Sequence, residues 1–154
     1  MYTKINEKDS AMKLGAIYSK EKTTFTLFSP VADSVFVIFY DKGNDSAEKG
    51  RLEMMRGEGE LRSIFSATAE GNLDGVYYTY EVHTSDGTFS SHDPYARACG
   101  VNGHRSMVID LSKTDPDGFA DEDRPKLADP MSMVITEVSV ADVSAGASAH
   151  SGYP

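Results

Sequence analysis

The first 112 residues alternate between apolar and polar positions in short segments, and this pattern predicts a chain built of β-strands. Residues 76–84 are the clearest example, because neighbouring side chains along a strand point to opposite faces. One face would carry Val76, Tyr78, Tyr80 and Val82, and the other Tyr77, Thr79, Glu81 and His83. Residues 35–40 are apolar throughout, which predicts a strand covered on both faces.

Turn residues separate the other predicted strands, which lie at residues 23–28, 51–56, 61–67 and 106–111. Asp86-Gly87 predicts a hairpin turn into residues 88–90. Strands at this close and regular spacing indicate an all-β sandwich. No long segment of helical period occurs between residues 10 and 112, so a layered α/β fold is disfavoured.

The pattern divides the chain into five parts. Residues 1–11 would be an N-terminal extension and residues 12–112 the sandwich. Residues 113–130 read as an acidic linker, since residues 110–130 hold seven acids against three bases. Residues 131–143 are strand-like again, and residues 144–154 are small and polar, as in a flexible tail.

Charge and hydropathy exclude several classes of partner. The formal net charge of −9 disfavours nucleic acid and anionic membranes, which bind basic surfaces. No apolar run is long enough to span a bilayer, and the first residues lack the apolar core of a signal peptide. We therefore expect a cytoplasmic protein, or a secreted one whose signal has been removed. Neutral ligands such as sugars remain open.

Residues 90–112 gather the types of side chain that carry chemistry, but not in a working pattern. Ser91-His92-Asp93 cannot act as a local triad, because consecutive residues of an extended chain point in different directions. Asp115 and Asp117 resemble part of a calcium loop whose end positions would be Lys113 and Arg124, which are not calcium ligands. No metal site and no cofactor is predicted.

The same stretch is better interpreted as the connection that closes the sandwich. Asp93-Pro94-Tyr95 would form a turn, with Tyr95 anchoring it by packing. Asn102 and Gly103 would reverse the chain, since both residue types tolerate positive φ. The aromatic rings of Tyr77 and Phe28 could stack weakly on a sugar or, as the alternative, pack against a neighbouring domain. The absence of Trp argues against tight sugar binding.

Four stretches, in order and at suitable spacing, resemble the type I pullulanases, which are α-1,6 debranching enzymes of glycoside hydrolase family thirteen. They are LGAIYSKEKTTFTLFSPVADSVFVIFY, GNLDGVYYTYEV, DPYARACGVNGHRSMVIDLSKTDPDGF and RPKLADP. In that family the third stretch closes an N-terminal carbohydrate-binding module of family forty-eight. The resemblance therefore implies an immunoglobulin-like (early-set) β-sandwich with a C-terminal extension.

Residues 133–144 resemble the first strand of the catalytic barrel in that family. Glu137, Val140, Asp142 and Ser144 fit its pattern, whereas Thr136, Ser139, Ala141 and Val143 replace its larger or charged residues. The nucleophile and general acid of the family lie on later barrel strands. The resemblance thus implies a non-catalytic module, inactive alone, from a natural, excised or engineered fragment. Its partners would be α-glucan, held weakly, or the catalytic barrel. The alternatives are a purely structural interaction domain and self-association through the C-terminal strand.

Overall fold

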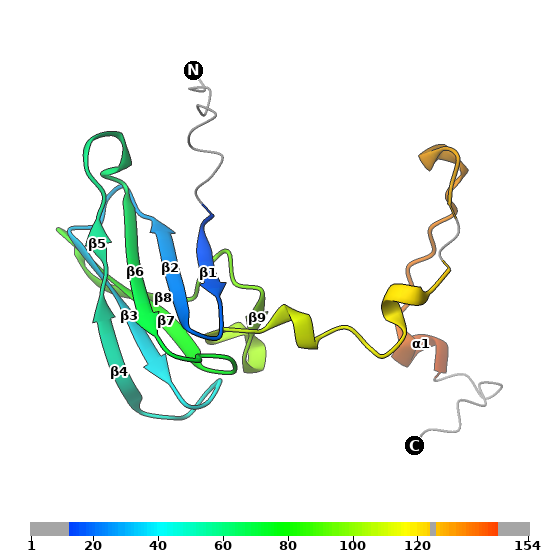
Figure 1. Ribbon diagram of the computed structural model, residues 1–154, viewed down its shortest axis with the longest axis horizontal. Helices are drawn as coiled ribbons and strands as arrows, with labels where there is room; N and C mark the ends of the chain where they lie inside the picture. The colour runs from blue at the N-terminus through cyan, green and yellow to red at the C-terminus, as the bar shows by residue number, and fades with distance from the viewer. Residues whose placement is uncertain (1–12, 124–125, 145–154) are drawn as a thin grey trace. The chain divides into compact units, whose positions relative to one another are not determined.

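The computed structural model describes residues 13–123 and 126–144 (Figure 1). The chain divides into two compact units, one reaching to Asp115 and the other starting at Pro116. The predicted N-terminal extension, and all of the predicted tail except Ser144, lie outside the described residues. In the described part, no helix is long and apolar enough to cross a membrane.

The first unit is a sandwich of two antiparallel sheets, which confirms the predicted all-β fold class (Figure 1). The first sheet has the strand order β1-β2-β6-β5. Its strands are β1 (Gly15–Tyr18), β2 (Lys22–Phe28), β6 (Ile64–Glu70) and β5 (Met55–Arg56). Both of its edge strands are short, and among the described residues no strand pairs with the outer side of β1.

The second sheet has the order β4-β3-β7-β10-β9, and β8 also pairs with β7. Its strands are β4 (Glu48–Glu53), β3 (Ser34–Tyr40), β7 (Tyr77–Thr84), β10 (Ser106–Met107), β9 (Ala98–Cys99) and β8 (Gly87–Ser91). The predicted hairpin is present, since β7 and β8 pair from Thr84 opposite Gly87. Tyr40 and Met107 both lie opposite Tyr77, so the end of β3 and the strand β10 flank β7 on its two sides.

The core lies between the inner faces of the two sheets. Phe25 of β2 makes edge-to-face contacts with Phe39 of β3 and Tyr78 of β7, at ring-centroid distances of 5.7 and 5.0 Å. Tyr78 and Tyr80 are fully buried, as the alternation along residues 76–84 predicts. Ile38, on the outer face of β3, is also buried, so this strand is covered on both sides.

Two predicted strands differ from what the structure shows. Residues 51–56 are not one strand, because β4 pairs in the second sheet and β5 in the first. Between them Met54 is buried and donates its backbone N–H to Val35. Residues 106–111 form a strand only at Ser106–Met107, and a 3₁₀ turn begins at Leu111. A period-two pattern does not show where a strand crosses between sheets or ends.

The prediction of a strand at residues 131–143 is wrong. The second unit contains 3₁₀ turns at Phe119–Asp121 and Pro130–Ser132, and α1 (Val140–Ser144). Residues 133–139 are irregular, and Val134 is 92% exposed. A strand needs a neighbour to satisfy its backbone groups, and no strand in the part of the chain that the structure describes pairs with this segment.

Candidate functional site

The two predicted sugar-stacking residues lie on opposite faces of the sandwich. Phe28 ends β2 on the outer face of the first sheet and is 52% exposed. Tyr77 begins β7 on the outer face of the second sheet and is half-buried. The two rings therefore cannot bind the same sugar together.

Two loops meet at the end of the second sheet where Tyr77 lies. Residues 41–47 follow β3, and residues 100–105 precede β10. Because both strands lie opposite Tyr77, the sheet brings together loops that are far apart in sequence. We call the depression between these loops the loop-pair pocket.

Close backbone contact fixes one loop against the other. A Cβ atom on Gly100 would lie 2.5 Å from Cα of Gly43, and a Cβ on Gly43 would lie 3.0 Å from the Tyr77 ring. Arg105 completes the connection by donating to the carbonyl oxygen of Lys42 at 2.7 Å and to both oxygens of Ser46. The loops are thus held in one arrangement without a ligand.

The loop-pair pocket has a volume of about 410 Å³ and a predominantly polar lining. Tyr40 forms part of it, with its hydroxyl 3.2 Å from that of Thr79. The guanidinium carbon of Arg105 lies 3.5 Å from the centroid of the Tyr40 ring. One face of the Tyr40 ring is therefore already occupied, which leaves little tyrosine surface for stacking on a sugar.

Polar side chains line the rest of the loop-pair pocket. They belong to Asn44, Asp45, Ser90, Asn102 and His104. Within the described part of the chain, none of these five side chains forms a hydrogen bond or an ion pair. Asp45 and Asn102 also hold positive φ angles of 47° and 53°, and they are the only non-glycine residues described that do so. Such strained backbone often occurs at binding sites, although Asn and Asp tolerate it better than most residues.

The closing stretch is anchored by Asp93 rather than by Tyr95. Asp93 is buried and accepts hydrogen bonds from the hydroxyls of Tyr78 and Tyr80, at 2.7 and 3.2 Å. Burial, and then the negative charge of Asp93, raise the pKa of both phenols, so both stay protonated as donors. Tyr95 is 47% exposed, so the prediction that its ring anchors the turn by packing is wrong. Its backbone N–H does donate to Asp93.

Pro94 and Gly103 hold the positions expected of turn residues. Pro94 follows Asp93 in a turn that the N–H of Ala96 closes onto the Asp93 carbonyl oxygen, at 3.1 Å. Gly103 has a φ of 70° beside Asn102, so the chain reverses there before β10.

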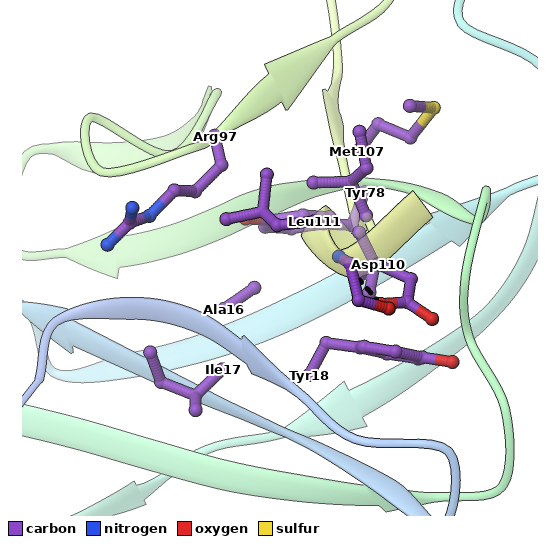
Figure 2. Close-up of a pocket in the computed structure, with 11 residues that line it drawn as sticks. Ala16, Ile17, Tyr18, Tyr78, Arg97, Met107, Asp110 and Leu111 are labelled. Carbon is purple, nitrogen blue, oxygen red and sulfur yellow. Dashed lines mark hydrogen bonds between the residues drawn. The ribbon is translucent and has the colours of Figure 1, made fainter. Parts of the chain in front are cut away.

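A second depression, the β1 groove, runs between β1 and the segment that follows β10 (Figure 2). Its volume is about 320 Å³. Figure 2 shows Ala16, Ile17 and Tyr18 on one side, Met107 and Leu111 across from them, and Arg97 at one end. Ile17 and Leu111 are exposed, so the β1 groove presents apolar surface to solvent.

Lys113 forms ion pairs beside Asp110 and Ser112, which line the β1 groove; we call this cluster the latch. Lys113 bonds to Asp74 at 2.7 Å and lies 3.7 Å from Asp110, whose carboxylate accepts the Ser112 hydroxyl at 2.6 Å. The Lys113 hydrogen bond lowers the pKa of Asp74, and the Ser112 hydrogen bond lowers that of Asp110. Partial burial, followed by the charges of Asp110 and Asp74, raises the pKa of Tyr18.

The sequence does not indicate the loop-pair pocket, because the pattern at Asn102 and Gly103 predicts only a turn. The available signal was weak: Gly43-Asn44-Asp45 and Asn102-Gly103 both contain residues that favour positive φ. Nothing in their spacing shows that these turns meet. That information lies in the pairing of β3, β7 and β10.

Residues 13–96, more than half of the chain, match the family model described as carbohydrate-binding module 48 (isoamylase N-terminal domain). The chain belongs to this family. The match ends before the loop that contains Asn102, so part of the loop-pair pocket lies beyond it.

The relatives of the chain are pullulanases. Pullulanase A of Streptococcus pneumoniae is 31% identical over 116 residues, which are 71% of this chain and 9% of that protein. Pullulanase 1, chloroplastic, of Arabidopsis thaliana is 28% identical over 142 residues, covering 86% of this chain and 14% of that one. The chain therefore spans about a tenth of the length of these curated relatives.

Solved structures agree with this assignment. Pullulanase from Paenibacillus barengoltzii, in complex with maltohexaose and α-cyclodextrin, matches with a TM-score of 0.71 and 34% identity, over 77% of this chain and 18% of that chain. Pullulanase from Bacillus acidopullulyticus matches with a TM-score of 0.70 and 34% identity, over 77% and 14% of the two chains. The predicted resemblance to the non-catalytic module of pullulanases is confirmed.

Proposed function

We propose that this chain is the N-terminal module of a pullulanase-like debranching enzyme and that its loop-pair pocket holds α-glucan weakly. The observation that carries the proposal is the set of five polar side chains in the pocket lining, four of them on the two locked loops, that have no partner among the described residues. Hydroxyl-rich, uncharged ligands suit such a lining, because amide, imidazole and hydroxyl groups can both donate to and accept from sugar hydroxyls. The Paenibacillus barengoltzii relative, solved with maltohexaose, supports α-glucan as the ligand.

Weak affinity follows from the same geometry. Arg105 covers one face of Tyr40, and the chain has no Trp, so stacking contributes little. Most of the binding energy would come from hydrogen bonds that replace equally good bonds to water. We expect a dissociation constant on the order of 1 mM, which corresponds to about −4 kcal/mol.

The test is an NMR titration of the full chain with maltoheptaose. Saturable shifts should appear at Asn44, Asn102 and His104 and be absent at Phe28. Replacing His104 with Ala should weaken binding several-fold, while F28A, on the opposite face, should bind as the wild type does. If shifts cluster at Phe28, or none appear at about 10 mM sugar, the loop-pair pocket is not a glucan site.

A purely structural role without sugar binding is the second candidate, and the exposed apolar surface of the β1 groove favours it. A null titration together with tight binding to the catalytic part of the enzyme would establish that role.

Self-association through residues 131–143 would be a further partner interaction. The exposed apolar side chains of Val134, Ile135 and Val140 favour it, because a second copy could supply the missing strand neighbour. Sedimentation of the full chain at increasing concentration tests this: a dimer that V134D abolishes would support it, and a monomer at all concentrations would exclude it.

A further inference from the structure

We propose that the β1 groove is the surface on which the domain following this module docks, and that it receives an apolar side chain flanked by a carboxylate. The inference rests on the proposed function, because it takes the partner to be the remainder of a pullulanase-like enzyme. It adds the location of the contact on the module and the chemistry of the group that fills it.

The first argument is the path of the chain. The segment from Met107 to Ser112 forms one wall of the β1 groove, and the chain continues from it into the second unit, which starts at Pro116. The latch from Lys113 to Asp74 fixes this exit point. A domain that follows in the same chain is thus connected to this wall of the groove through the second unit, and such a tether raises the effective concentration of a partner.

The second argument is the difference in charge between two edge strands of the sandwich, β4 and β1. At the edge formed by β4, the charged side chains of Glu48, Lys49, Arg51 and Glu53 guard the strand against pairing. β1 has no charged residue: it reads Gly-Ala-Ile-Tyr, and its Ile17 faces solvent next to Leu111. An apolar edge strand without charged side chains is unfavourable in water, and it is typical of a surface that another protein surface covers.

The third argument is the charge of Arg97. Its side chain lies at one end of the β1 groove, and no hydrogen bond or ion pair is formed by it within the described residues. Covering this guanidinium without a partner would be costly, so a surface that docks here must supply an acceptor. A carboxylate in bidentate contact is the acceptor that best fits Arg.

The same charge argues against a second copy of this chain as the occupant. A two-fold interface in which one groove faces another would place Arg97 near its own equivalent. The net charge of −9 adds repulsion between copies. A domain with a different sequence need not place a like charge opposite Arg97.

The experiment uses the isotope-labelled full chain and, as the probe, the pullulanase of Bacillus acidopullulyticus from which the segment aligned with this chain is deleted. NMR detects even millimolar binding. We expect shifts at β1 and at residues 107–112. I17D, L111D and R97E should each weaken binding at least about tenfold, or roughly 1.4 kcal/mol. M55D is the matched control, because Met55 is an exposed apolar residue on the other edge strand of the same sheet.

Several results would overturn the proposal. They are no binding by the wild-type chain, loss of binding by M55D while I17D still binds, or broadening without the probe that I17D abolishes, which would indicate a second copy. If the deleted pullulanase fails to fold, this chain is grafted into the intact enzyme in place of the aligned segment. A docked module should then unfold together with the rest, and I17D should separate the two transitions; two transitions in the unmutated graft refute docking.

The sugar titration separates this proposal from the proposed function. I17D leaves the loop-pair pocket untouched, so maltoheptaose shifts at Asn102 should persist in that variant. Docking without sugar binding would remove only the glucan role, and sugar binding without docking would remove only the role of the β1 groove.

Discussion

Two segments of this chain have similar strand-like sequences, but only one of them forms a strand. Ser34–Tyr40 forms β3, paired on both sides and buried through Val37. Residues 133–140, Met-Val-Ile-Thr-Glu-Val-Ser-Val, are even richer in β-branched residues but include no strand and are exposed. β-propensity reflects fit to a pleated, half-buried surface rather than an intrinsic preference of the backbone. The difference therefore lies in the neighbours that each segment finds.

The largest expected effect is on stability and comes from placing an aspartate in β3 rather than in residues 133–140. Val37 has no exposed surface, so V37D buries a charge in the core. We expect a loss of more than about 4 kcal/mol, which approaches the whole stability of a small domain. V134D should change the stability of the sandwich by less than about 0.5 kcal/mol, because Val134 is exposed.

Urea unfolding followed by circular dichroism measures both variants. Equal destabilisation by V37D and V134D would mean that the sandwich depends on residues 133–140. The comparison would then fail.

A second prediction concerns the closing stretch, residues 90–112. The carboxylate of Asp93 connects this stretch to the sandwich by accepting hydrogen bonds from Tyr78 and Tyr80. D93A removes the acceptor shared by two buried tyrosine hydroxyls. We expect a loss of about 3 kcal/mol, because buried donors without partners carry their full desolvation cost. Y95A should cost less than about 1 kcal/mol, since the ring is largely exposed.

Thermal unfolding of the two variants side by side tests the assignment of the anchor. D93N retains the shape but offers an acceptor without charge, so it should fall between the wild type and D93A. A Y95A variant less stable than D93A would return the anchoring role to the tyrosine ring.

The smallest expected effect on stability concerns the latch, in which Lys113 lies just before the boundary between the two units in the sequence. The pKa values of Asp74 and Asp110 are lowered in the folded state, so the latch stabilises the fold above their ordinary values near 4. This contribution disappears as the pH falls through the lowered values. The pKa of Lys113 is raised, so its contribution persists until the pH exceeds about 10.

K113M should therefore lower the melting temperature by at most about 3 °C at pH 7, because the ion pairs are exposed. As the pH falls through the lowered pKa values of Asp74 and Asp110, the melting temperatures of the wild type and K113M should converge, since protonated carboxyls no longer pair with Lys113. A difference that does not shrink as the pH falls would show that Lys113 acts by packing rather than by charge.

The sequence by itself determined the class of fold. Alternating positions placed β2, β6 and β7 within three residues of their observed bounds, because one buried face imposes a period of two on a strand, and the continuous apolar run placed β3, which is covered on both faces. It also located the hairpin before β8 and the reversal at Asn102 and Gly103, where local conformational preference and structure agree. The family resemblance could likewise be identified from the residues alone.

The tertiary structure decided what depends on partners distant in sequence. It separated β4 from β5, left residues 133–139 without a strand, and made Asp93 rather than Tyr95 the anchor. It brought Asp45 and Asn102 into one pocket and placed Phe28 on the opposite face from Tyr77. A local pattern specifies the face to which a side chain points, but burial, hydrogen bonding and the meeting of loops arise only when the sheets pair and pack.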